Sequence, residues 1–240
     1  MSDPVVPFPY DWRVSDDGRL IEVRTPLGWS APVLTAAERP RAQQTWDKWR
    51  DLFMKHAART GVPLAWLVAV CTWESGGDPK AESPAGAIGL MQLMPVLWGG
   101  RSKAEMTDPE TNMRLGADFL RQLREGTTLK FGGLHDRLPE VASCYNCGAA
   151  EWTPAIVPKR PVGSSAYPWG LCENTQVLPS GERKNLGYIS KVVATANDAT
   201  KGHLTGWPKA STPATRKGSG GGGGVVMLAI AVGLVWYLQR

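Results

Sequence analysis

The sequence is poor in cysteine and uses glycine and proline without any period. Four cysteines among 240 residues are too few for a disulfide-dense secreted scaffold. The 27 glycines and 19 prolines are spread irregularly, which excludes collagen-like and coiled-coil classes. No internal repeat is visible at a spacing of about 20–50 residues. These absences leave one well-buried domain with appendages as the expected organisation.

The start of the chain lacks the features of an export signal. The segment MSDPVVPFPYDW (1–12) has an acidic residue, prolines and aromatics where a signal peptide has a basic start and an apolar run. What is present instead is 42% hydrophobic residues with 11 tryptophans, which excludes disorder throughout. A net charge of +5 suits an anionic partner such as a cell-wall polymer, a phospholipid or nucleic acid. The basic residues form no stripe, so we do not expect nucleic-acid binding.

Hydrophobic periodicity predicts a mainly α fold. Trp46, Trp49 and Phe53 recur at steps of three and four residues and predict a helix over about 40–59. A second helix, 63–75, would place Glu74 on the same face as Leu67. Further elements are expected as a strand at 19–23, a turn and one or two helical turns at 84–94, and helices at 108–125, 138–147 and 184–198.

Composition divides the chain into four parts. Residues 1–34 are expected to form an extended arm packed on the main domain, and 35–200 to form that main domain, with an irregular excursion at 148–183. The Thr-, Pro- and Gly-rich stretch 201–224 is predicted to be a flexible linker. The fourth part is the apolar stretch 225–238, which follows this linker.

The stretch 225–238 is predicted to be a transmembrane helix. Fourteen helical residues cover about 21 Å, and counting back through Gly221 gives about 27 Å, close to the ~30 Å hydrocarbon core. Trp236 and Tyr237 suit the membrane–water interface. The alternative is a helix buried in the protein's own core, against which the loose glycine linker argues. We therefore expect a single-pass membrane protein with a C-terminal anchor.

Glu74 is the candidate for a catalytic acid. It ends a helix whose buried face it shares, and Ser75, Gly76 and Gly77 follow it and leave room for a ligand. A carboxyl in an apolar rim has a raised pKa, so it can stay protonated near neutrality and donate a proton. The alternative is an ordinary solvated glutamate at the end of a helix.

Four segments resemble motifs of one enzyme family. They are ESGGDPKAESPAGAIGLMQLMP (74–95), DPETNMRLGADFL (108–120), CYNCG (144–148) and YISKVV (188–193). Together and in this order they resemble the lytic transglycosylases related to the soluble bacterial enzyme, a lysozyme-like family that cleaves peptidoglycan. The resemblance covers about 45–198 and implies a mainly α, lysozyme-like domain of the soluble-lytic-transglycosylase (SLT) type.

The resemblance also implies roles for individual residues. Glu74 corresponds to the single catalytic acid and base, and Ser83 to a serine that holds the reacting sugar's acetamido group or the catalytic carboxyl. Tyr145 corresponds to a tyrosine that hydrogen-bonds near the catalytic carboxylate. The remaining substrate-binding positions implied are Gln92, Met94, Asn146 and Tyr188. Gly86 and Gly89 are implied as turn glycines, and Asn112 and Gly116 as scaffold.

The chain departs from the family pattern at two positions. Cys147 stands where the family usually has alanine, and Lys184 where it often has glutamate. Cys144 and Cys147 with Cys172 and a histidine would be one alternative, a zinc site, but the two clean ligand pairs typical of zinc are missing. A Cys147–Cys172 bridge is another alternative. Cys71 and Cys144 are interpreted as small core residues, and no metal or cofactor is expected.

A single carboxyl implies a reaction in which the substrate supplies the nucleophile. Most glycosidases use two carboxylates. With Glu74 alone, we expect cleavage of the β-1,4 bond between N-acetylmuramic acid and N-acetylglucosamine with closure of a 1,6-anhydro ring. The alternatives are hydrolysis of the same bond by a lysozyme-type route, and a catalytically inactive peptidoglycan-binding or assembly protein on the same fold.

Peptidoglycan lies outside the cytoplasmic membrane, whereas the predicted anchor leaves the domain on the side where it was made. A bacteriophage particle with an internal membrane would resolve this conflict. We therefore expect a virion enzyme that opens the wall locally for genome delivery, with peptidoglycan glycan strands, a lipid membrane and other virion proteins as partners. The alternative is a bacterial inner-membrane protein whose domain acts in the periplasm.

Overall fold

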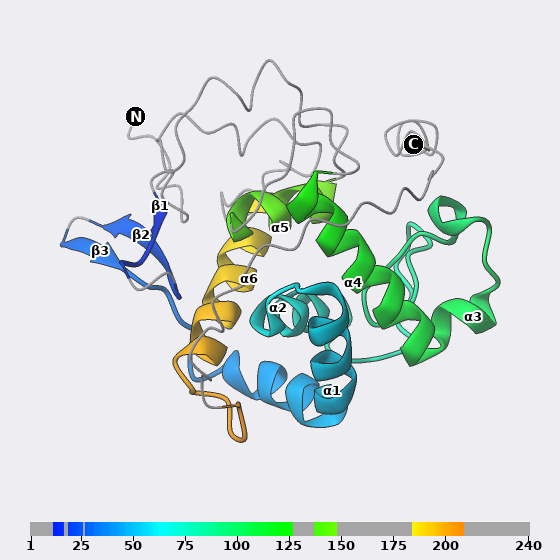
Figure 1. Ribbon diagram of the computed structural model, residues 1–240, viewed down its shortest axis with the longest axis horizontal. Helices are drawn as coiled ribbons and strands as arrows, with labels where there is room; N and C mark the ends of the chain where they lie inside the picture. Colours follow the sequence, from blue (N-terminus) through cyan, green and yellow to red (C-terminus); the bar gives the residue numbers. More distant parts are fainter. Residues whose placement is uncertain (1–11, 17–18, 26, 127–136, 148–183, 209–240) are drawn as a thin grey trace, which may run out of the picture.

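The computed structural model describes residues 12–16, 19–25, 27–126, 137–147 and 184–208 (Figure 1). The expected excursion at 148–183, the glycine-rich part of the linker and the membrane segment 225–238 lie outside these residues. Within the described parts of the chain, no helix is both long and apolar enough to cross a membrane. The mainly helical fold class is confirmed for the described residues.

Helix α2 (Leu64–Glu74) is the centre of the domain. It is surrounded by α1 (Arg39–Thr60), α4 (Pro109–Glu125), α5 (Leu138–Cys147) and α6 (Lys184–Thr200) (Figure 1). All seven side chains from Trp66 to Thr72 are buried. A helix that is apolar all round must be covered on every side, which is why the other helices enclose it.

The residues at the two ends of helix α1 account for where it begins and ends. The carboxylate of Glu38 accepts hydrogen bonds from the backbone N–H and the hydroxyl of Thr35, and the helix begins at the next residue. Pro40 lies in the first turn, where a missing N–H costs nothing. Gly61 ends the helix in the left-handed region with φ 70°. The predicted helix over 40–59 is therefore present and slightly longer.

The segment between α2 and α4 differs from the sequence prediction. The helical turns expected before Pro95 are absent; residues 82–93 form a loop held by isolated bridges from Ile88 to Glu82 and Leu93. The helical turn η1 (Pro95–Trp98) instead begins at the proline, because proline suits the first helical position. Helix α3 (Lys103–Thr107) was not expected and has a capping box at its start.

The chain before α1 contains a small sheet. Strands β1 (Trp12–Val14), β2 (Ile21–Thr25) and β3 (Gly28–Ser30) pair antiparallel in the order β1-β2-β3, so the described part of the expected extended arm is a sheet (Figure 1). The buried side chain of Asn197 on α6 accepts from the backbone N–H of Ile21 at 2.9 Å and donates to its carbonyl at 2.8 Å. These bonds fix the sheet to α6.

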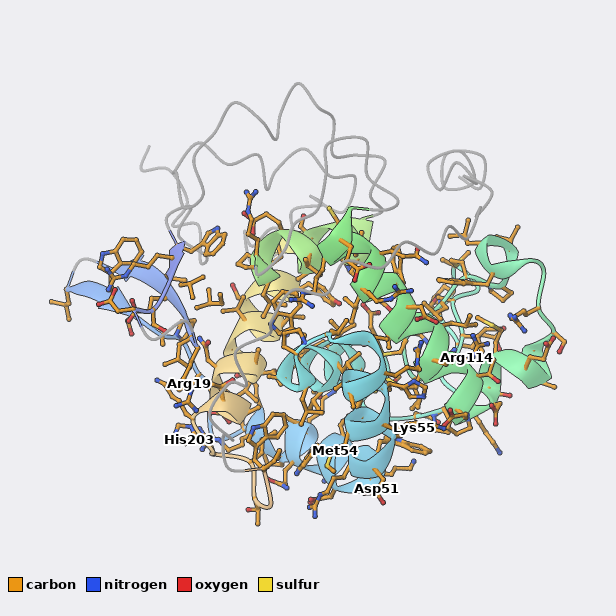
Figure 2. All side chains as sticks on the ribbon, in the orientation of Figure 1. Arg19, Asp51, Met54, Lys55, Arg114 and His203 are labelled. Atoms are coloured by element: carbon orange, nitrogen blue, oxygen red, sulfur yellow. The ribbon has the colours of Figure 1, made fainter. Side chains whose placement is uncertain are left out.

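Ion pairs tie the helices together at the edges of the domain. Asp198, fully buried near the end of α6, accepts from Arg39 at 2.8 Å and lies 2.7 Å from Nδ1 of His203. On the opposite side, Lys55 of α1 pairs with Glu110 of α4 at 2.5 Å; His203 and Lys55 mark these two places in Figure 2. These pairs join α1 to α6 and α1 to α4 near the helix ends.

Candidate active site

Glu74 is the last residue of α2, and the turn that follows fixes its position. Gly76 and Gly77 both have positive φ, 64° and 78°, which glycine adopts without strain. The hydroxyl of Ser75 donates to the carbonyl of Leu90 at 2.8 Å and accepts from the N–H of Gly77 at 3.1 Å. The end of α2 is thus joined to the 82–93 loop.

The Glu74 carboxyl accepts a hydrogen bond from a tyrosine that is 114 residues away in the sequence. The hydroxyl of Tyr188, on α6, donates to Oε1 of Glu74 at 2.7 Å. Burial raises the pKa of Glu74 to about 7, and the bond from Tyr188 partly opposes this by favouring the ionised form. The carboxyl can therefore give up or take up a proton near neutral pH, as an acid and base must.

Tyr145 lies in the same cluster but bonds elsewhere. Its hydroxyl donates to the carbonyl of Met91 at 2.7 Å, and its ring is 5.2 Å from that of Phe119. Burial raises the pKa of Tyr145 well above its usual value, and the negative charge of Glu74 adds to that rise. Tyr145 therefore lies close enough to Glu74 to feel its charge while it anchors the 82–93 loop, and the hydroxyl that bonds to the carboxyl itself is that of Tyr188.

Side chains of the 82–93 loop hydrogen-bond to backbone groups in or next to the same loop. The hydroxyl of Ser83 accepts from the N–H of Ala87 at 3.0 Å. The side-chain amide of Gln92 donates to the carbonyls of Ala81 and Gly89 at 3.0 and 3.2 Å, and Gln92 has φ 46°, a strained conformation for a residue other than glycine. Both side chains hold the backbone of this segment, and none of their described hydrogen bonds reaches Glu74.

Asn112 of α4 holds this loop from beneath. It is fully buried; its amide donates to the carbonyls of Ile88 and Met106, both at 2.9 Å, and its oxygen accepts from Met91 N–H at 2.7 Å. Gly89 packs directly on it: a Cβ there would lie 2.4 Å from the Asn112 nitrogen. The scaffold role implied for Asn112 is visible in these bonds.

The other expected binding residues lie near the loop or on α5. Met94 is partly buried and directly precedes η1. Asn146 follows Tyr145 on α5 and is also partly buried. The side chain of Cys147, together with Cys172, lies outside what the structure describes. Met94 and Asn146 are therefore placed beside the cluster without a described hydrogen bond to Glu74.

Glu140 was missed by sequence reasoning. Its side chain is fully buried on α5, pairs with Arg137 at 2.8 Å and leaves Oε2 without a partner among the described groups. Burial raises the pKa of Glu140 to about 8, against the attraction of Arg137. A charged residue at an inward position of α5 is the only signal that the sequence offers for it.

The described residues contain no group of three or more potential metal ligands from histidine, cysteine, aspartate and glutamate. Cys71 and Cys144 are free thiols buried in the core, as their interpretation as small core residues predicted. Burial raises the pKa of both thiols, so they stay protonated. The chemistry available at the site is proton transfer by Glu74.

The part of the chain that contains Glu74 and Tyr145 is similar to a known domain family. Residues 51–157 match the model of the transglycosylase SLT domain family. The soluble lytic murein transglycosylase of Escherichia coli (strain K12) is 30% identical over 159 residues, which are 61% of this chain and 22% of that protein. The endo-type membrane-bound lytic murein transglycosylase A of Klebsiella pneumoniae (strain 342) is 36% identical over 90 residues, 33% of this chain and 44% of that protein. The chain thus spans less than half the length of these relatives.

Among solved structures, the lytic transglycosylase Slt of Pseudomonas aeruginosa, in an inactive mutant form, superposes with a TM-score of 0.49 at 21% identity. The alignment covers 67% of this chain and 25% of that one. The 70 kDa soluble lytic transglycosylase of Escherichia coli gives a TM-score of 0.48 at 23% identity, over 66% of this chain and 24% of that one.

Proposed function

We propose that this chain, whose residues 51–157 match the SLT domain, is a peptidoglycan lytic transglycosylase. It cleaves the β-1,4 bond between N-acetylmuramic acid and N-acetylglucosamine and leaves 1,6-anhydro ends. One observation carries the proposal: the Glu74 carboxyl, which lies within the matched residues and has a pKa raised to about 7 by burial, accepts a hydrogen bond from the hydroxyl of Tyr188 at 2.7 Å.

The reaction begins with Glu74 protonated. The carboxyl donates its proton to the bridging oxygen as the bond from that oxygen to C1 of N-acetylmuramic acid breaks. The sugar's own acetamido oxygen stabilises the positive charge that develops at C1. The leaving N-acetylglucosamine end takes the proton and departs as an alcohol.

The second step restores the acid. Glu74, now a carboxylate, takes the proton of the C6 hydroxyl, and O6 forms a bond to C1 and closes the anhydro ring. Every proton lost in the first step is regained in the second, and no water is consumed. A pKa near 7 suits both steps, because the group must give and accept a proton at the same pH.

Tyr188 orients the carboxyl in both steps. Since its hydroxyl occupies Oε1, the exchanging proton is carried by Oε2. The 82–93 loop then forms the wall of the sugar cleft, with Ser83, Gln92 and Met94 on the loop side and Tyr145 on α5. Asn146 completes the substrate-binding set.

Digestion of purified sacculi tests this function. The parent protein is expected to release products about 18 Da lighter than hydrolysed muropeptides, since no water is added. Glu74→Gln is expected to release none, while the matched variant Glu125→Gln, an exposed glutamate on α4, keeps the parent rate. Products with reducing ends would show a lysozyme-type hydrolase. Absence of any product from the parent would show a binding or assembly protein.

The biological setting we propose is a bacteriophage particle. The sequence-predicted membrane segment 225–238 would anchor the enzyme in a virion membrane, and local opening of the wall would allow genome delivery. The alternative is a bacterial inner-membrane enzyme acting in the periplasm. Detection of the chain in purified, washed particles by mass spectrometry supports the virion role, and its recovery only from uninfected cell membranes would refute that role.

A further inference from the structure

We propose that a basic and aromatic patch beside Glu74, formed by Arg41, Trp73 and Lys191, binds a carboxylate of the substrate. The proposal deepens the function proposed above and rests on it. Arg41 comes from α1, Trp73 from α2 and Lys191 from α6, so the patch exists only where these three helices meet.

Two cationic side chains lie against the indole ring of Trp73. The guanidinium carbon of Arg41 lies 5.2 Å and the ammonium nitrogen of Lys191 4.9 Å from the centroid of this one ring. The indole N–H donates to the hydroxyl of Thr195 at 2.7 Å, and Thr195 is fully buried. The ring is thereby fixed, while Arg41 and Lys191 are exposed and can reach a ligand.

Two helices, α2 and α6, connect the patch to the catalytic carboxyl. Trp73 directly precedes Glu74 on α2. Lys191 follows Tyr188 by three residues on α6, so the two side chains lie on the same side of that helix. Arg41 also contacts the turn after Glu74, since a Cβ on Gly76 would lie 3.2 Å from its guanidinium. The two helices that provide Glu74 and Tyr188 thus also provide Trp73 and Lys191, and the proposal is that a glycan strand bound at Glu74 extends to both cations.

Neither cation has an acidic partner among the described residues. Arg13, Arg39 and Arg59 each pair with a carboxylate at 2.7 or 2.8 Å, which is the usual arrangement in this domain. Arg41 uses only Nε, which donates to the carbonyl of Thr72 at 2.8 Å and stabilises the end of α2. Its two terminal nitrogens have no hydrogen bond in the described parts, and neither does the Lys191 ammonium. Terminal guanidinium nitrogens are suited to paired hydrogen bonds with a carboxylate.

A carboxylate is the anion that the proposed substrate carries. Where the peptide is attached, its own carboxyl groups carry this charge, and where the peptide has been removed, the lactyl group of N-acetylmuramic acid carries it. Stacking of a neutral sugar on Trp73 is disfavoured, because cations already lie against the ring. Charge rather than ring stacking is therefore the expected basis of recognition at this patch.

The test is a binding measurement in which nothing is cleaved. Lys191→Met is made in the Glu74→Gln background, and Lys201→Met, which removes an exposed lysine just beyond the other end of α6, is the matched control. Dissociation constants are measured by calorimetry for three ligands. The first is peptide-bearing glycan strands, and the second is amidase-treated strands, whose only carboxylate is the lactyl one. The third is N-acetylglucosamine oligomers, which have no carboxylate. Circular dichroism checks that each variant is folded.

We expect Lys191→Met to weaken binding of carboxylate-bearing strands roughly two- to fivefold, the range of an exposed ion pair, and the loss to shrink in high salt. A loss confined to peptide-bearing strands identifies the peptide carboxylates, and a loss confined to amidase-treated strands identifies the lactyl carboxylate, because that carboxyl is an amide wherever the peptide is attached. A loss with both kinds of strand shows that the patch accepts either carboxylate. Unchanged affinity, an equal loss with the uncharged oligomer, or no binding to any ligand overturns the proposal. The proposed function fails separately, if the parent protein releases no 1,6-anhydro product.

Discussion

Replacing Glu74 with glutamine should stabilise the protein, and increasingly so as the pH rises. In the folded protein burial raises the pKa of this carboxyl to about 7, whereas in the unfolded chain it is near 4.5. Between these values the folded state holds a proton that the unfolded state has released, so the parent loses stability as pH rises. Glutamine is neutral at every pH and its oxygen can still accept the bond from Tyr188.

The size of the effect follows from the shift. A difference of about 2.5 pH units corresponds to at most about 3–4 kcal/mol, since each unit is worth about 1.4 kcal/mol. The gain from Glu74→Gln should thus be close to zero at pH 4, appear between pH 4.5 and 7, and level off above pH 7. The buried Glu140 and His56 titrate in both proteins, so their contributions cancel in the difference.

Urea denaturation of parent and variant at half-unit steps from pH 4 to pH 8 measures this difference directly. The m-values should agree, so that midpoints report stability alone. Glu125→Gln is the control, because that glutamate is exposed and its replacement should give no pH-dependent gain. Parallel stability curves for parent and Glu74→Gln would refute the claim that the carboxyl is held protonated by burial.

Three further predictions concern the tyrosine and the loop. Tyr188→Phe removes a bond that favours ionised Glu74, so the alkaline limb of the pH–rate profile should move to higher pH and the rate fall roughly tenfold; an unmoved limb would contradict this. Gly89→Ala should destabilise the domain by about 2–4 kcal/mol in thermal unfolding, because its Cβ would overlap buried atoms, whereas Gly86→Ala, with similar φ and open space, should cost only about 1–2 kcal/mol. Asn112→Leu should cost at least about 2 kcal/mol, since it removes the described partner of the Met91 N–H and of the Met106 carbonyl and one of the two bonds to the Ile88 carbonyl; a smaller loss in urea denaturation would mean that the loop supports itself.

Several features could be predicted from local sequence because local chemistry decides them. A helix was expected over 108–125, and the carboxylate of Asp108 caps α4 by accepting from the N–H of Thr111 at 2.8 Å. The apolar spacing from Trp46 to Phe53 predicted α1, and both side chains are fully buried. A cap or a helical stripe involves residues within a few positions of each other, so the sequence alone contains the needed information.

The turn region shows where local reasoning failed. Pro95 was expected to close a helical stretch, yet it begins one, and the preceding loop is instead held by Asn112 from α4. Two of the hydrogen bonds that hold this loop come from Asn112, which is more than twenty residues away in the sequence. Spacing within the loop could not reveal a partner on another helix.

The sequence by itself determined that the domain is helical, that α2 is buried, and that Glu74 stands at its end before a glycine turn. Only the tertiary structure decided which hydroxyl reaches that carboxyl: both Tyr145 and Tyr188 lie in the recognised motifs, and packing of α6 against α2 gives the bond to Tyr188. The same packing sets the pKa near 7 and brings Arg41 and Lys191 to Trp73. The physical reason is that burial and contacts between distant helices depend on how surfaces pack together, a property that no stretch of the chain possesses alone.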